Sequence, residues 1–176
     1  MRVLNSRSVY KGRIIELEID RIIEPQGVEA EREVVRHPGS VVVLPRFPGS
    51  RILLVRQFRY AARRSLWELV AGSLGPRESA VKAAARELRE ETGYSAAKFR
   101  LLFRFYSSPG FLDEKMHLFE ALDLRSGDAM PERDERIEAR LFSLSELREM
   151  IAAGKIQDGK TLVGLLWLLA KTRLPR

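Results

Sequence analysis

The sequence predicts an α/β fold in which helices cover both faces of a mixed β-sheet, with an extension of strands at the N-terminus. Two observations lead to this prediction. Most of the chain divides into short segments that alternate apolar and polar residues or are continuously apolar, separated by turns rich in glycine and proline. Three segments, one central and two near the C-terminus, instead repeat apolar residues at helical spacing. Many strands with few helices are expected to form a sandwich around one sheet.

The first 38 residues carry the strand extension. Residues 8–22 contain period-two stretches, with a turn expected near Gly12. A further strand is expected between Val28 and Val34, where every second residue is a glutamate. A loop of His, Pro, Gly and Ser follows. We therefore expect residues 1–38 to form a separate extension and residues 39–176 to form one folded domain.

The middle of the chain combines strands with one helix. Residues 41–45 and 52–59 predict strands with a turn between them, and residues 67–71 run directly into Gly72. A short helix is expected after this glycine-rich loop, and Gly93 stands where a left-handed C-terminal cap is expected. The residues expected on the buried face of the helix are Val81, Ala84, Ala85 and Leu88.

The C-terminal part continues with two strands and two helices. Strands are expected near residues 99–106 and 116–122, with loops at 107–114 and 124–136. After an extended segment at 140–143, Ser143 or Ser145 is expected to cap a helix that runs through about Ala153. The last helix is expected at roughly residues 160–172. Its residues expected to face the core, at helical spacing, are Leu162, Leu165, Leu166 and Leu169.

Composition narrows the class of protein. A length of 176 residues suits a single domain with a sizeable core. The chain contains no cysteine, which fits a reducing compartment, and its longest apolar run, residues 162–170, is too short to span a bilayer. The start lacks the apolar stretch of a secretory signal, so we expect a cytoplasmic protein without a membrane partner. The net charge of +7 is dispersed, so nucleic-acid binding is permitted but not indicated.

Three glutamates gather on the central helix. Glu87 and Glu91 lie one turn apart, about 6 Å along the helix, and Glu90 lies beside them. Like charges at this spacing oppose helix formation by a few tenths of a kcal/mol per pair, unless something offsets them. A divalent cation such as Mg²⁺ prefers carboxylate oxygens of this kind. Taken alone, however, such a cluster is more often a solvated charged face.

The wider spacing favours the metal interpretation. Gly72 is followed after five residues by Glu78, and after seven more by Arg86-Glu87-Leu88-Arg89-Glu90-Glu91-Thr92-Gly93-Tyr94. This arrangement matches, without a gap, the signature of the Nudix hydrolases, and the chain resembles that family from about Val9 to the last helix. The resemblance implies a Nudix-type α/β/α sandwich, with residues 39–176 as the Nudix hydrolase domain.

The resemblance also implies roles for the signature residues. Glu87 and Glu91 correspond to the usual principal ligands of Mg²⁺, which Mn²⁺ can replace, and Glu90 assists them in metal binding and catalysis. The main-chain carbonyl of Ala71 is the natural further ligand, because the glycine that follows lets the backbone approach a cation. The residues expected to support this arrangement structurally are Gly72, Glu78, Arg86 and Gly93.

The flanking segments resemble the ADP-ribose and nucleoside-diphosphate-sugar pyrophosphatases. The similar blocks are residues 55–60, 67–72 and 108–114, and Pro109 stands fifteen residues after Tyr94, a position associated in that group with ADP-ribose. Arg56 fits a diphosphate clamp because a guanidinium pairs bidentately with phosphate, although a strand-edge surface charge is an alternative. Glu68 is expected either to pair with Arg56 or to contact the ligand.

The loop at 107–114 supplies the expected base. Glu114 is the candidate general base or third metal ligand, with its neighbour Asp113 as the alternative, and Gly110 is expected to border the substrate. In the group that the chain resembles, an N-terminal region of a partner subunit often holds the nucleobase. Tyr10 is the candidate for stacking on adenine, and a tyrosine packed in the core is the alternative.

A second motif is expected to be structural. Residues 154–161 read Gly, four residues, Gly-Lys-Thr, which fits a phosphate-binding loop. Such a loop follows a buried strand, whereas here a helix is expected before it. We therefore interpret Gly154 as a helix cap and residues 158–161 as the start of the next helix.

Together these observations predict a Mg²⁺-dependent enzyme that hydrolyses the diphosphate bond of ADP-ribose to AMP and ribose 5-phosphate. The resemblance implies a homodimer with exchanged N-terminal strands. Two alternatives stay open. One is a Nudix pyrophosphatase for another nucleoside-diphosphate derivative, such as other nucleoside-diphosphate sugars, NADH or capped RNA. The other is a module that senses ADP-ribose without turnover, against which the complete set of carboxylates argues.

Overall fold

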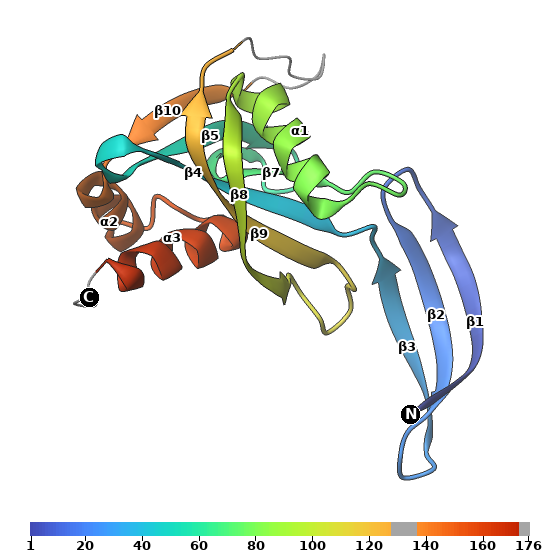
Figure 1. Cartoon of the computed structure of the whole chain (residues 1–176). Helices are drawn as coiled ribbons and strands as arrows, with labels where there is room; N and C mark the ends of the chain where they lie inside the picture. Colours follow the sequence, from blue (N-terminus) through green and yellow to red (C-terminus); the bar gives the residue numbers. More distant parts are fainter. Residues whose placement is uncertain (128–136, 173–176) are drawn as a thin grey trace.

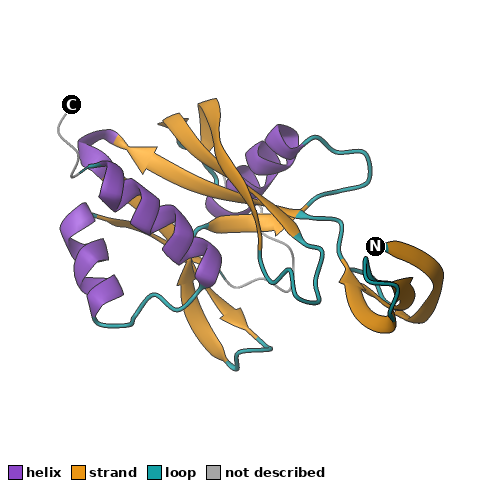
Figure 2. Ribbon diagram, turned by 90° about the horizontal axis from the view of Figure 1, so that it is seen from below, coloured by secondary structure: helices purple, strands orange, loops and turns teal. Residues whose placement is uncertain are grey.

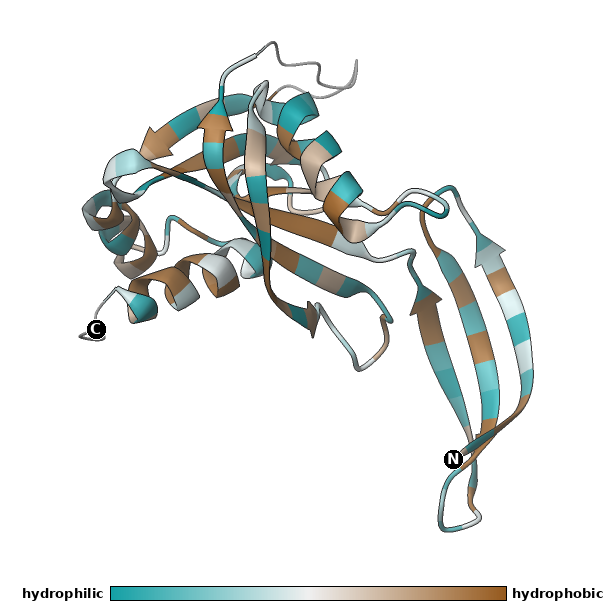
Figure 3. Ribbon diagram, viewed as in Figure 1, coloured by the Kyte–Doolittle hydropathy of each residue, from teal (hydrophilic) through white to brown (hydrophobic). Residues whose placement is uncertain are grey.

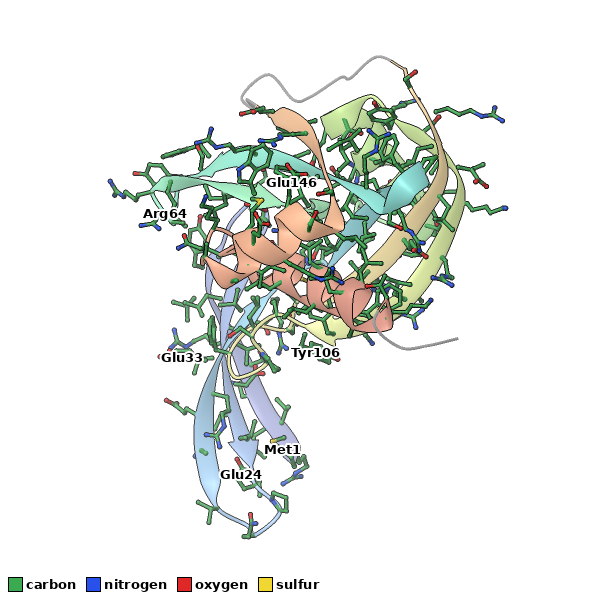
Figure 4. The ribbon with its side chains drawn as sticks, turned by 90° about the vertical axis from the view of Figure 1, so that its left-hand side faces the viewer. Met1, Glu24, Glu33, Arg64, Tyr106 and Glu146 are labelled. Atoms are coloured by element: carbon green, nitrogen blue, oxygen red, sulfur yellow. The ribbon has the colours of Figure 1, made fainter. Side chains whose placement is uncertain are left out.

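The structure is a computed structural model, and it describes residues 1–127 and 137–172. The N-terminal part forms a three-stranded antiparallel sheet of β1 (Arg2–Lys11), β2 (Glu16–Ile23) and β3 (Glu29–Arg36), in this spatial order. This sheet projects from the main part of the molecule (Figure 1) and is joined to the loop at 107–114 by a bridge between Val35 and Leu112. Met1 and Glu24 mark its far end, away from the helices (Figure 4). The predicted strand extension is therefore present.

The main sheet has seven strands, and its spatial order is β10-β5-β4-β9-β8, with β6 beside β5 and β7 beside β4. The parallel pairing of β4 with β9 is combined with antiparallel pairing elsewhere, which makes the sheet mixed, as predicted. The turn before β5 is a short 3₁₀ helix, Pro48–Ser50. The strands are β4 (Ser40–Phe47), β5 (Arg51–Arg59), β6 (Arg64–Glu68), β7 (Val70–Ser73), β8 (Ser95–Tyr106), β9 (Lys115–Arg125) and β10 (Glu138–Phe142).

Helices cover both faces of this sheet. One face packs on α1 (Ala80–Thr92), and the other on α2 (Leu144–Ala152) and α3 (Gly159–Lys171) (Figure 2). Strand β4 serves both layers, because successive side chains point to opposite faces. Its Val41 and Val43 belong to the core under α1, and its Val42 and Leu44 to the core under α2 and α3. The predicted α/β/α sandwich is confirmed.

The helix ends follow the predicted signals. Gly93 has φ 73° and caps α1 through its N–H, which donates to the carbonyl of Arg89. Ser143 starts α2 with a reciprocal capping box to Glu146. The segment that resembles a phosphate-binding loop joins α2 to α3, so no strand precedes it. The side chain of Asp158 accepts from the N–H of Thr161 and caps α3.

Two predictions of buried faces need correction. In α1, Val81 and Ala85 are exposed, and the buried stripe runs through Ala83, Ala84 and Leu88 to Glu91. The apolar spacing misplaced this face because a carboxylate occupies part of it. In α3, Leu162 is half-buried and Leu166 is half-exposed. The buried residues are Thr161, Gly164, Leu165, Leu168 and Leu169.

Hydropathy differs between the two sheets. Apolar residues concentrate between the main sheet and its helices, whereas the N-terminal strands alternate apolar and polar residues along a sheet without a helix on it (Figure 3). The predicted loop at 124–136 lies partly outside the described residues, since residues 124 and 125 end β9 and residues 128–136 are not described. In the described ranges, no helix is long and apolar enough to cross a bilayer.

Candidate active site

The site forms where α1 crosses β7. The carboxylate of Glu87 fills the space beside the backbone of Gly72, so that a Cβ added to Gly72 would lie 1.9 Å from Oε1 of Glu87. Any side chain at position 72 would displace this carboxylate. The loop that leads into α1 is closed by the N–H of Gly75, which donates to Oε2 of Glu78 at 3.0 Å. Strand β7 and helix α1 thus bring a carboxylate directly against the backbone.

Arg86 connects the carboxylates of α1. Its guanidinium donates to both oxygens of Glu78 at 3.1 and 3.0 Å, to Oε1 of Glu87 at 2.7 Å and to Oε2 of Glu90 at 3.0 Å. It also donates to the carbonyl of Ser73 at 3.2 Å. The hydrogen bond to Glu78 is the largest cause that raises the pKa of Arg86, and the same bond lowers the pKa of Glu78. Arg86 therefore balances the like charges that the sequence places together.

A cleft of about 420 Å³ opens beside these groups. Its walls combine α1, β7 and the turn between β1 and β2, which are distant in the sequence. The predicted residues Ala71, Gly72, Arg86, Glu87 and Glu90 line it, together with Arg13, Ile14, Arg59 and residues 73–75. Sequence reasoning missed Arg13, Ile14 and Arg59. The arginine-rich block at 55–60 carried a signal for Arg59, but spacing alone did not identify which arginine faces the carboxylates.

Glu91 lies on the inner side of α1. It is 7% exposed, and its charge interacts with that of Arg59. Its neighbours Glu87 and Glu90 remain partly accessible, with side chains 13% and 31% exposed. The three glutamates therefore face different surroundings: Glu87 and Glu90 border the cleft, whereas Glu91, which was expected to be a principal metal ligand, is buried behind it and does not line it.

Arg59 is fixed by a buried ion cluster. Glu68 is 1% exposed and accepts from Nε and Nη2 of Arg59, both at 2.8 Å, and from Nζ of Lys160 at 2.5 Å. Burial alone would raise the pKa of Glu68, but the bonds and charges of Arg59 and Lys160 outweigh it and lower this pKa. Lys160 belongs to the segment that resembles a phosphate-binding loop, and it is thus part of the ion cluster. Its Nζ also donates to Asp158 at 2.9 Å.

The structure does not bring Arg56 to the cleft. Arg56 and Arg59 are three residues apart on β5, so their side chains point to opposite faces of the strand. Val55, which shares the face of Arg59, packs under α1. Arg56 instead lies 3.7 Å from Glu138 on β10, and its side chain is half-exposed. The expected pairing of Glu68 with Arg56 is therefore replaced by its pairing with Arg59.

Glu114 lies on the other face of the main sheet. Its carboxylate accepts from the hydroxyls of Ser40 and Ser107, each at 2.7 Å. Ser40 shares its face of β4 with Val42, which packs towards α2 and α3, whereas the backbone of Gly72 faces α1. The alternative residue, Asp113, accepts from the N–H of His37 at 2.8 Å. Both side chains thus anchor the loop at 107–114 and do not line the cleft.

Two further predicted residues also lie outside the cleft. The ring of Tyr10 covers Gly12, with Cε1 only 2.8 Å from the position of a Cβ at Gly12. Tyr10 is 58% exposed, so the alternative of a core tyrosine does not hold either. Gly110 lies in an exposed turn, and a Cβ added to it would meet nothing within 4 Å. The turn after Tyr10 does reach the cleft, because Arg13 and Ile14 line it together with the carboxylates.

The donor chemistry of the cleft fits a hard divalent cation. Glu87 and Glu90 offer carboxylate oxygens beside the backbone of Ala71. Within the described part of the chain, no three acidic or histidine side chains are grouped closely enough to hold a metal ion together. Arg86 donates to both Glu87 and Glu90. Mg²⁺ commonly binds through one or two carboxylates and keeps several waters, so the two accessible glutamates are sufficient.

The chain is similar to known proteins over almost its full length. The pattern of the NUDIX domain family matches residues 35–162. An ADP-ribose pyrophosphatase of Bacillus subtilis is 34% identical over 175 residues, which cover 98% of this chain and 95% of the relative. A methanol dehydrogenase activator of Bacillus methanolicus is 34% identical over 169 residues, with coverage of 95% and 91%.

A solved structure supports the same conclusion at the level of the fold. The crystal structure of an ADP compounds hydrolase superposes with a TM-score of 0.83 at 21% identity, over 98% of this chain and 96% of that one. The match to the family pattern includes both the glycine-rich loop at Gly72 and all of α1. The chain therefore belongs to the Nudix family.

Proposed function

We propose that the protein hydrolyses the diphosphate bond of ADP-ribose, giving AMP and ribose 5-phosphate, with Mg²⁺ as cofactor and Mn²⁺ as a substitute. The observation that carries the proposal is the meeting of Glu87, Glu90 and Arg59 in one cleft. The two carboxylates can bind a metal cation, and the guanidinium of Arg59 can bind a phosphate. The B. subtilis relative, which is similar over almost the full length, is named for this activity.

The residues divide the work by their surroundings. Glu87 and Glu90 would hold the metal, which when bound neutralises diphosphate charge and lowers the pKa of a water. Glu91 would support them from the buried side of α1. Nε and Nη2 of Arg59 donate to Glu68, whereas Nη1 does not donate to Glu68. Arg59 would therefore present a fixed charge to the diphosphate, where guanidinium–phosphate bonds are strong.

The nucleoside is best placed against the turn between β1 and β2. Ile14 offers apolar surface in the same cleft as the carboxylates, and it is 49% exposed. A base that packs on Ile14 would keep its diphosphate near Glu87. We place the nucleobase here in preference to Tyr10, whose ring lies over Gly12.

We also propose that the protein is a homodimer joined through its N-terminal sheets. Every residue of β1 is exposed, and apolar side chains lie bare on this strand and on the turns beside it. A small sheet with an uncovered apolar edge strand is marginally stable and prone to pair. A second copy of this sheet would cover it. Sedimentation of wild type and of Val9→Lys tests this proposal. Wild type should sediment as a dimer and the variant as a monomer. A wild type that sediments as a monomer would overturn the proposal.

Turnover over a panel of substrates tests the activity. The panel consists of ADP-ribose, other nucleoside-diphosphate sugars, NADH and capped RNA, with phosphate release measured through a coupled phosphatase. We expect magnesium-dependent release that is fastest with ADP-ribose. A higher kcat/KM with another member would reassign the substrate. Binding of ADP-ribose without any turnover would instead identify a sensor.

A further inference from the structure

The cleft at α1 adjoins a second cavity at the turn between β1 and β2. This cavity has a volume of about 590 Å³ and lies between the N-terminal sheet and the loop before α1. It shares Arg13, Ile14, Leu74 and Gly75 with the cleft, so the two spaces lie side by side. A molecule bound at Glu87 therefore lies next to the second cavity.

The lining of the second cavity contains more basic than acidic side chains, with Lys11, Arg13, Arg36 and Arg77 against Glu16. Lys11 is balanced by Glu16 at 3.3 Å. Arg36 is balanced by Glu18 at 2.6 Å, by Asp20 at 2.9 Å and by Asp113 at 3.4 Å. Arg13 and Arg77 line the same cavity, and no carboxylate of the described residues forms an ion pair with either of them. Two arginines from separate parts of the chain thus line one cavity, and neither forms an ion pair within the described residues.

The loop before α1 holds Arg77 in an unusual conformation. Its φ of 59° lies in the left-handed region, which is unfavourable for a residue other than glycine. The turn around it is closed by two bonds, from the N–H of Glu78 to the carbonyl of Gly75 and from the N–H of Gly75 to Oε2 of Glu78. Since Glu78 is itself bound to Arg86, the group that organises the carboxylates also fixes the position of Arg77.

We propose that Arg13 and Arg77 form a subsite for an additional phosphate, so that the preferred substrates are nucleoside-diphosphate derivatives with a further phosphomonoester on the nucleoside. The inference rests on the proposed function, because it assigns the diphosphate to the cleft at Glu87. Paired charge–phosphate hydrogen bonds from two arginines are strong and geometrically selective. A nucleic acid is a poorer candidate, because its affinity depends on a series of phosphate contacts and this cavity offers two unbalanced charges.

The test compares two ligands that differ by one phosphate. Binding of ADP-ribose and of its 2′-phosphate to the full chain is measured by titration calorimetry in EDTA, where no metal-dependent turnover occurs. We expect wild type to bind the 2′-phosphate about tenfold more tightly, which corresponds to about 1.4 kcal/mol. Arg77→Gln should reduce this ratio to near one. Arg64→Gln, at the exposed tip of the β5–β6 hairpin, should keep it (Figure 4).

Each other outcome overturns the inference. A ratio near one in wild type removes the subsite, and equal weakening of both ligands by Arg77→Gln assigns this arginine to the shared diphosphate. Tighter binding of a short oligonucleotide than of either ligand, lost in Arg77→Gln, reassigns the cavity to nucleic acid. If wild type binds neither ADP-ribose nor its 2′-phosphate, the inference is also rejected. The proposed activity fails separately, if ADP-ribose is not turned over with Mg²⁺ present.

Discussion

The carboxylate of Glu87 occupies the position where any residue other than glycine at position 72 would carry its Cβ. Oε1 lies 1.9 Å from that position and Oε2 lies 2.5 Å from it. The glycine is therefore required by close approach, and its backbone does not adopt a positive φ. This single relationship links the glycine-rich loop to the helix and brings an acidic side chain against the main chain beside Ala71.

Gly72→Ala should abolish most activity with little effect on stability. The methyl group would push the end of the Glu87 side chain away, and a flexible side chain can move at small cost. We expect turnover to fall at least ~100-fold, as for loss of a positioned charge, while the free energy of unfolding changes by about 1 kcal/mol. The matched control is Gly159→Ala, where nothing lies within 4 Å of the new Cβ. Full activity in Gly72→Ala would contradict the site.

Removing the charge of Glu91 should separate catalysis from folding. Glu91→Gln keeps the shape of a 7%-exposed side chain and removes a charge that interacts with Arg59. We expect turnover to fall by roughly 10²–10⁴-fold with an unchanged circular dichroism spectrum. Glu33→Gln, at an exposed position of the N-terminal sheet, serves as the control (Figure 4). Equal turnover in the two variants would remove Glu91 from the site.

A pair of arginine variants decides which guanidinium meets the diphosphate. Arg59→Lys loses the planar fork that both Glu68 and a phosphate use, so KM should rise about tenfold. Arg56→Lys changes a half-exposed charge next to Glu138, and KM should stay within about twofold. Steady-state kinetics with ADP-ribose measure both values. A larger effect at Arg56 would restore the assignment expected from sequence.

The Glu68 cluster should make stability depend on acid pH. The folded pKa of Glu68 is lowered, so its ionised form stabilises the fold above its ordinary pKa of about 4.3, and this stabilisation is lost as pH falls through the folded pKa. Glu68→Gln leaves Arg59 and Lys160 without their shared partner, and we expect a loss of about 2–3 kcal/mol at pH 7.

The difference in the free energy of unfolding between wild type and Glu68→Gln should become smaller as the pH is lowered below about 4, because Glu68 of wild type is then protonated and loses its charge. Urea unfolding at pH 7, 5 and 3.5 measures it. Glu33→Gln again provides the comparison, since its carboxylate is exposed. A difference that is constant across this range would show that the charge of Glu68 does not stabilise the fold.

Local patterns were sufficient for the three helices and their caps, whereas the residues predicted as one strand at 67–71 divide between β6 and β7. The left-handed cap at Gly93 and the capping box at Ser143 involve neighbours within a few residues, so their signals are complete in the sequence. The buried face of α1 was less predictable, because Glu91 occupies an inner position that a purely apolar pattern excludes. The missed side chain, Arg59, depended on the face of β5, which an arginine-rich strand end does not reveal.

By itself, the sequence determined the sandwich, the strand extension and the helix with three glutamates that follows the glycine-rich loop. The reason is that spacing along the chain fixes which residues share a helix or a strand. Only the tertiary structure decided which distant residues meet. It brought Arg13, Ile14 and Arg59 to Glu87 and placed Glu114 across the sheet. The physical reason is that strand order and the side of each crossover are set by packing of the whole core, and a single residue of register moves a side chain to the opposite face.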